Sequence, residues 1–142
     1  MSDKKEVKIF IIEDDFIFIE ILVNILESIN SEFKYKNLKL LYQTFYSAKE
    51  AEFEFSQNPD IVLLDYFIMD DELRADTGTK VIKDIKEKNL NIDVIIVSGQ
   101  ESPVIKQQLL SDGAYAYISK DEKSLSQLKP LLIKLINERL ER

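Results

Sequence analysis

The sequence predicts an α/β fold in which a five-stranded parallel sheet carries helices on both faces. Five short apolar runs alternate with segments whose apolar residues recur at helical spacing. This alternation is typical of parallel sheets with right-handed crossovers. The predicted strands are 7–12, 38–42, 61–64, 94–97 and 114–119, and the predicted helices are 16–29, 47–56, 77–88, 102–112 and 124–140.

The strands are recognised from unbroken apolar stretches. The segments 9–12, 61–64 and 94–97 contain only Ile, Val, Leu and Phe. A strand of this composition is typical of a parallel sheet that is covered on both faces. We therefore expect the strand over 61–64 to be fully buried.

The helices are recognised from their start and stop signals. Ser47 and Glu50 form a capping-box pattern that opens the second helix, and Pro59 follows its end. Pro103 suits the first position of the fourth helix, and Gly113 suits the residue just after it. These signals place the loops between the predicted strands and helices.

The last helix contains Pro130, which cannot sit in a regular helix interior. We expect either a kink at that residue or a break, with the main helix starting near Lys129.

Length and composition restrict the classes of function. The chain has 142 residues, of which 45% are hydrophobic, and we expect a single domain over 1–142 with a loose segment 1–6 and a core over 7–140. It contains no Cys and no His. Thiolate chemistry, zinc–thiolate sites and imidazole catalysis are therefore excluded. A nucleophile must be a carboxylate, a hydroxyl or an amine, and any metal should be a hard cation.

The charge and the lack of long apolar stretches indicate the compartment and the partners. The net charge of -7 counts against direct binding of nucleic acid, which requires a cationic surface. The apolar stretches are too short to span a bilayer, and none resembles a signal peptide. We expect a cytoplasmic protein with no membrane contact.

Polar side chains follow four of the predicted strands. Glu13 and Asp14 follow the first strand, Asp65 the third, Ser98 the fourth and Lys120 the fifth. Parallel strands direct their carboxyl ends to one edge, where ligands of such sheets bind. Neighbouring carboxylates repel each other, and a divalent cation relieves that repulsion. Because histidine is absent, we expect Mg²⁺, held by Asp14, Asp65, a backbone carbonyl and water.

These groups suit the transfer of a phosphoryl group to a carboxylate. An Asp side chain can attack phosphorus and form an acyl phosphate. The charge on the phosphoryl oxygens requires hydrogen-bond donors, and Lys120 and Ser98 offer an ammonium and a hydroxyl. A bound cation neutralises part of the same charge.

The order of these motifs resembles the response regulator receiver domain, the phosphoacceptor module of two-component signalling, and is similar to the chemotaxis receiver. The resemblance covers about residues 7–140 and rests on Glu13-Asp14, on the segment 59–65, on Ser98 and on Lys120. It implies a flavodoxin-like sheet with strand order 2-1-3-4-5. Because no effector domain follows residue 142, we expect a stand-alone receiver whose output passes through an unknown partner protein.

The resemblance also implies a role for each site residue. Asp65 would accept the phosphoryl group from a sensor histidine kinase or a phosphotransfer protein. Asp14 would be the main Mg²⁺ ligand, with Glu13 acting through water and the backbone carbonyl of Phe67 completing the protein ligands. Lys120 would pair with the phosphoryl oxygens.

The resemblance further implies a switch that alters partner binding. Ser98 would be the hydroxyl that moves toward the phosphoryl group. Tyr117 would change its exposure with Ser98, although it equally fits the role of a core residue. The partner would bind a face formed by the fourth helix, the fifth strand and the last helix. The same face suits a weak dimer, so a monomer and a weak dimer both remain open.

Three departures from the family pattern bear on activity. The loop over 66–77 has no Pro, and it is longer and more acidic than usual. Asp121 stands where the family has a Pro in a cis bond, and a cis bond before Asp would cost about 3 kcal/mol. Phe67 and Gln100 flank the attacking water in the family. An apolar Phe67 cannot orient water, so we predict self-phosphorylation from phosphodonors followed by slow autodephosphorylation.

Three other functions compete with the phosphoacceptor switch. The altered loop and the missing Pro favour an atypical receiver that acts as a phosphorylation-independent interaction module. A phosphatase of the haloacid dehalogenase type would need a second Asp at position 67, which is Phe. A flavodoxin would need a Ser/Thr-rich loop after the first strand, and that loop is acidic here.

Overall fold

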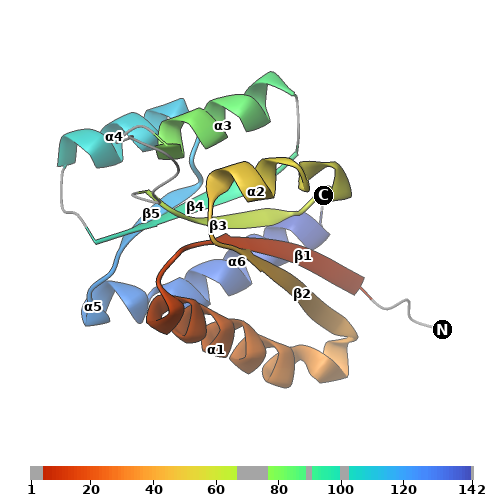
Figure 1. Cartoon of the computed structure of the whole chain (residues 1–142). Helices are drawn as coiled ribbons and strands as arrows, with labels where there is room; N and C mark the ends of the chain where they lie inside the picture. The colour runs from red at the N-terminus through yellow and green to blue at the C-terminus, as the bar shows by residue number, and fades with distance from the viewer. Residues whose placement is uncertain (1–4, 67–76, 89–90, 100–102, 142) are drawn as a thin grey trace.

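Five parallel strands form one sheet in the computed structural model, which describes residues 5–66, 77–88, 91–99 and 103–141 (Figure 1). Neighbouring strands follow the order β2-β1-β3-β4-β5. The predicted α/β class and the strand order 2-1-3-4-5 are thus confirmed. The strands are β1 (Lys5–Ile12), β2 (Leu38–Phe45), β3 (Ile61–Asp65), β4 (Asp93–Ser98) and β5 (Ala116–Ser119).

Helices cover both faces of the sheet, as predicted (Figure 1). One face carries α1, α5 and α6, and the other carries α2, α3 and α4. Among the described residues, no helix combines the length and the apolar character that a membrane crossing requires. The helices are α1 (Phe16–Phe33), α2 (Ala48–Glu52), α3 (Thr77–Glu87), α4 (Pro103–Asp112), α5 (Glu122–Leu125) and α6 (Leu128–Leu140), with 3₁₀ turns η1 (Lys34–Lys36) and η2 (Phe55–Gln57).

The central strand β3 is buried along its whole length because the core has two parts. Ile61 and Leu63 point into the cluster beneath α1 and α6. Val62 and Leu64 point into the cluster beneath α2, α3 and α4. Successive side chains of a strand point to opposite faces, so a strand covered on both sides needs apolar residues throughout. Asp65 ends this strand and is itself buried.

The strand ends differ from the predicted ones because backbone pairing decides them. β2 continues to Phe45 rather than ending at residue 42, since its pairing with β1 runs on until Ile12 faces Phe45. The polar residues Gln43 and Thr44 lie within this paired segment. An edge strand can carry polar side chains without losing its hydrogen bonds, so apolar character alone underestimates its length.

Side-chain caps open α1 and α2, and the capping box predicted at Ser47 is present with one difference. Asp15 caps α1, with its Oδ1 accepting hydrogen bonds from the amides of Ile17 at 2.9 Å and Phe18 at 3.4 Å. Ser47 caps α2 by accepting from the amide of Glu50. The Glu50 carboxylate accepts from the amide of the residue before Ser47, at 3.3 Å, rather than from Ser47 itself.

The C-terminal segment is broken rather than continuous. A single helix over 124–140 is therefore wrong, and the alternative of a break before a main helix is confirmed. Pro130 is the third residue of α6, within the first turn, where helical amide groups have no helical partner. Asp121 caps α5 by accepting from the amide of Ser124 at 2.7 Å. The bond between Lys120 and Asp121 is trans.

The end of α6 forms ion pairs at the amino ends of the strands, on the side of the sheet opposite the acidic residues. The Arg139 guanidinium pairs with Asp93 at 2.7 Å and with Asp60 at 3.1 Å, and it also donates to the carbonyl of Asn91. Asp60 precedes β3 and Asp93 begins β4. This single side chain therefore joins α6 to the starts of two central strands.

The outer edge of β2 is partly covered by α1. The Asn30 amide accepts from the amide of Leu40 at 2.7 Å and donates to the Leu40 carbonyl at 3.2 Å. Nearby, the Tyr42 hydroxyl donates to Glu27 at 2.9 Å. The two Asn30 bonds satisfy the backbone groups of Leu40 in a strand that has a strand neighbour on one side only.

Candidate functional site

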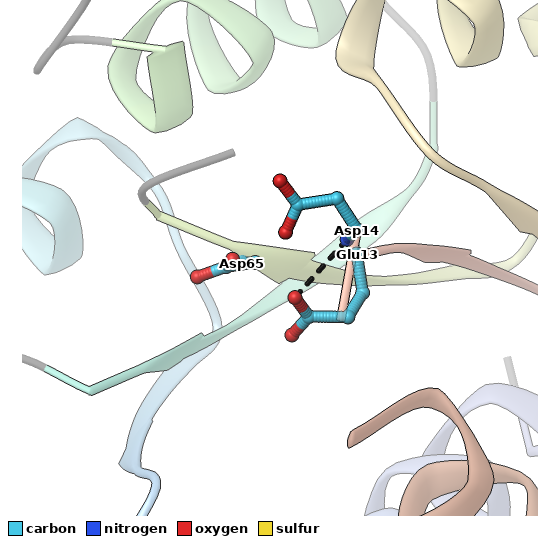
Figure 2. A group of neighbouring side chains, drawn as sticks. All are labelled: Glu13, Asp14 and Asp65. Atoms are coloured by element: carbon cyan, nitrogen blue, oxygen red, sulfur yellow. Dashed lines mark hydrogen bonds between the residues drawn. The ribbon is translucent and has the colours of Figure 1, made fainter. Parts of the chain in front are cut away.

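Three carboxylates meet at the carboxyl ends of β1 and β3. Figure 2 shows Glu13, Asp14 and Asp65 side by side. One oxygen from each lies within 4.8 Å of the others. Glu13 and Asp65 are buried, whereas Asp14 is exposed. The structure thus brings together the three acidic residues that the sequence predicted as a group.

The Glu13 side chain folds back beneath the turn that follows β1. Its Oε2 accepts hydrogen bonds from the amides of Asp14 at 3.1 Å and Asp15 at 3.2 Å. The first of these bonds is drawn in Figure 2. Because these two bonds orient the carboxylate, its other oxygen is directed toward Lys120.

Lys120 joins the acidic group from the end of β5. Its amide donates to the Ser98 carbonyl at 2.8 Å, which extends the pairing of β4 with β5 by one step. Its ammonium lies 2.7 Å from Glu13 Oε1 and 3.6 Å from Asp65 Oδ2. Lys120 therefore lies close to both carboxylates, and its shorter contact is with Glu13.

Burial dominates the ionisation of Glu13. The pKa of this carboxyl is raised from 4.5 to about 7, and removal from water is the largest cause. The hydrogen bond from Lys120 lowers the pKa, and the negative charge of Asp65 raises it. Near neutral pH, Glu13 is therefore poised between its charged and neutral forms.

The two predicted switch residues lie on neighbouring strands. Ser98 ends β4, is fully buried, and faces Ser119 across the β4–β5 pairing. Tyr117 is half-buried and packs against the cluster beneath α2, α3 and α4. The predicted metal ligand Phe67, and Gln100, lie outside the described residues.

A further residue, Phe18, touches the site and was missed by the sequence reasoning. The Lys120 ammonium lies over its ring, 4.4 Å from the ring centroid. Phe18 belongs to α1 and is 7% exposed. In the sequence Phe18 is one apolar residue of the first predicted helix, and no motif marks it. The contact depends on how far the Lys120 side chain reaches across the sheet, which no local pattern encodes.

The donor chemistry of the acidic group fits a hard divalent cation. Three carboxylates lie close together, and oxygen ligands are those that Mg²⁺ prefers. Asp14 and Asp65 are the residues that would hold it. Both oxygens of Glu13 already accept hydrogen bonds, so Glu13 suits a contact through water. A cation here would offset the repulsion that buried neighbouring carboxylates create.

The sequence model of the response regulator receiver domain matches residues 9–131. This match spans most of the 142 residues, and the chain belongs to the response regulator receiver domain family. The group Glu13, Asp14 and Asp65 resembles the acidic triad of the receiver Mg²⁺ and phosphoacceptor site. Receiver domains typically partner with histidine kinases. None of the curated proteins compared with the chain matches it significantly.

Solved structures of receiver domains share the fold. The chain is similar to the receiver domain of the putative response regulator NarL from Mycobacterium tuberculosis, with 22% identity, a TM-score of 0.67 and coverage of 92% of this chain and 97% of that one. The receiver of a DNA-binding response regulator from Colwellia psychrerythraea has 23% identity and a TM-score of 0.71, and the match covers 92% of this chain and 98% of that one. A LuxR-family DNA-binding response regulator from Staphylococcus aureus has 25% identity and a TM-score of 0.64, with coverage of 91% and 98%.

Proposed function

We propose that this receiver domain is a phosphoacceptor switch in which Asp65 takes a phosphoryl group in an Mg²⁺-dependent reaction. The observation that carries the proposal is the meeting of three carboxylates within 4.8 Å, with the Lys120 ammonium beside two of them. Buried carboxylates that share a site are costly unless they are partnered. Their presence at a ligand-binding edge favours a functional role over a purely structural one.

The chemistry follows from the positions of the side chains. A carboxylate oxygen of Asp65 attacks the phosphorus of a phosphohistidine. The new O–P bond forms as the N–P bond breaks, and the imidazole leaves with the electron pair and takes up a proton. Asp14 and Asp65 would hold Mg²⁺, which would neutralise part of the phosphoryl charge. Lys120 lies within reach of Asp65 and binds a phosphoryl oxygen that carries developing charge.

The donor protein would dock beside the site on the first turns of α1. Phe16 and Ile17 are 71% and 73% exposed there. The rings of Phe16 and Tyr46 meet edge to face, with their centroids 5.5 Å apart. Exposed apolar side chains that gather on one surface are typical of protein interaction sites. A kinase or phosphotransfer protein seated on them would present its phosphohistidine to the neighbouring carboxylates.

The phosphoryl group would be read out through β4 and β5. Ser98 is buried at the end of β4, next to the strand that carries Tyr117 and Lys120. A phosphoryl oxygen on Asp65 would attract the Ser98 hydroxyl and draw Lys120 from Glu13. These movements would change the surface formed by α4, β5, α5 and α6, where the partner binds.

An interaction module that works without phosphorylation is the second candidate. It is favoured by the 2.7 Å contact between Lys120 and Glu13, which holds the ammonium nearer to Glu13 than to Asp65. In that function the buried ion pair would fix one surface permanently.

The test is the intact mass of the protein after incubation with acetyl phosphate and Mg²⁺. We expect the wild type to gain one phosphoryl group that hydroxylamine removes, as is typical of an acyl phosphate. Asp65→Asn should gain none. Asp15→Asn is the matched control, because it replaces a neighbouring carboxylate but keeps a capping side chain for α1.

Each outcome separates the two functions. Labelling of the wild type and of Asp15→Asn, but not of Asp65→Asn, supports the switch. A folded wild type that gains no mass would contradict it and favour the phosphorylation-independent module. The rate at which the label disappears then tests the slow autodephosphorylation predicted from Phe67.

A further inference from the structure

The Lys120 ammonium is held from three sides. It lies 2.7 Å from Glu13 Oε1, 3.6 Å from Asp65 Oδ2 and 4.4 Å from the centroid of the Phe18 ring. We propose that Phe18 is a positioning residue, whose ring face keeps the Lys120 ammonium within reach of the phosphoryl group on Asp65. This inference rests on the proposed function and assigns a residue that acts on the reaction through Lys120.

The Phe18 ring is fixed by its own surroundings. Asp15 caps α1 and accepts from the Phe18 amide at 3.4 Å, which sets the backbone at this point. The ring belongs to the buried cluster that also contains Ile118, two residues before Lys120. Because Phe18 and Ile118 belong to the same buried cluster, packing restricts the movement of the ring.

The ring offers an attraction that the carboxylates do not. A cation over an aromatic face is attracted by the negative charge density of the ring, and the attraction grows when water is excluded. The Lys120 side chain is only 18% exposed, so one side of its ammonium faces the Phe18 ring rather than water. A leucine would fill a similar space but has no negative face.

The ring also leaves the ammonium free to change partners. Glu13 and the phosphoryl oxygens compete for the same N–H donors of Lys120. A carboxylate that accepts a hydrogen bond occupies one of these donors. The Phe18 ring interacts with the positive charge instead and occupies the donors less. Lys120 can therefore move from Glu13 toward Asp65 while it keeps its contact with the ring.

The experiment compares Phe18→Leu with a series in which fluorinated phenylalanines replace Phe18. Fluorine withdraws charge from the ring face with little change of shape, so this series weakens the cation–π attraction and largely preserves packing. The first readout is the proton shift of the Lys120 ε-methylene group by NMR in metal-free protein. The second is the rate of labelling by acetyl phosphate and Mg²⁺.

We expect a ring-current shift of the ε-methylene protons in the wild type and in the fluorinated proteins, and its loss in Phe18→Leu. Labelling should slow roughly two- to tenfold in Phe18→Leu, which is the factor that a contact of this kind supplies. It should slow stepwise as fluorine atoms are added. A purely structural role would not follow the number of fluorine atoms.

Two results would overturn the inference. One is an ε-methylene shift in the wild type that is the same in Phe18→Leu, since the ring would then not contact the ammonium. The other is a labelling rate equal in all variants. Failure of the proposed function is seen separately, because the wild type itself would then not be labelled, and Phe18 would lose its role in the reaction.

Discussion

The ionisation of Glu13 makes the stability of the metal-free protein depend on pH. Its pKa is raised from 4.5 to about 7, chiefly by burial. The folded protein therefore binds this proton more tightly than the unfolded chain does. The difference between the two pKa values corresponds to about 3 kcal/mol of unfolding free energy. Glu13→Gln removes the titrating group and is the perturbation that isolates this effect.

The sign of the effect follows from the direction of the pKa shift. The stabilising contribution is fully present below pH 4.5 and is lost as the pH rises through about 7. Most of the change lies in an accessible range. Between about pH 5.5 and about pH 8, the Glu13 contribution should fall by about 2 kcal/mol.

The assay is urea unfolding of both proteins in a chelating buffer across this range. Other carboxylates titrate in both proteins, so the difference between the two curves reports Glu13. We expect the wild type to lose about 2 kcal/mol relative to Glu13→Gln as the pH rises from about 5.5 to about 8. An identical pH dependence in the two proteins would refute the reasoning.

Three further perturbations test other parts of the structure. Asp121→Ala should lower the unfolding free energy by about 1 kcal/mol in urea, because α5 loses its cap, whereas Asp121→Asn should not. Arg139→Ala should lower the unfolding free energy by about 1–3 kcal/mol in the same assay, because two acidic side chains lose their partner. Lys134→Ala is the control and should change the unfolding free energy little, because Lys134 is exposed on α6. Mg²⁺ at about ten times its dissociation constant should stabilise the wild type by about 1.4 kcal/mol in thermal melts. An equal effect of Mg²⁺ on Asp14→Asn would contradict the proposed metal site.

The parts of the fold that could be predicted are those that local patterns determine. The apolar segment 61–64 must be buried on both faces, and it is the centre of the sheet. Parallel strands then place Glu13, Asp14 and Asp65 at one edge, so the acidic group followed from the strand assignments alone. The position of the cap at Asp15 was also predictable, because its side chain precedes a run with helical spacing.

The parts that could not be predicted depend on how far side chains reach and on positions where the sequence allows two different local structures. The preference of Lys120 for Glu13 over Asp65 follows from the two amides that turn the Glu13 carboxylate. Pro130 allowed a kink or a break, and the sequence did not decide between them. Asp121 could be compared only with the Pro of the family, whereas the structure shows that it caps a new short helix.

The Asn30 amide has a consequence for the behaviour of the protein at high concentration. A strand at the side of a sheet can recruit a strand from another molecule, because its outward amide and carbonyl groups offer a template for growth. At Leu40 both of these groups already bond to Asn30. A second molecule would have to displace that side chain before the two sheets could merge across β2. One asparagine on α1 thus opposes aggregation at this side of the sheet.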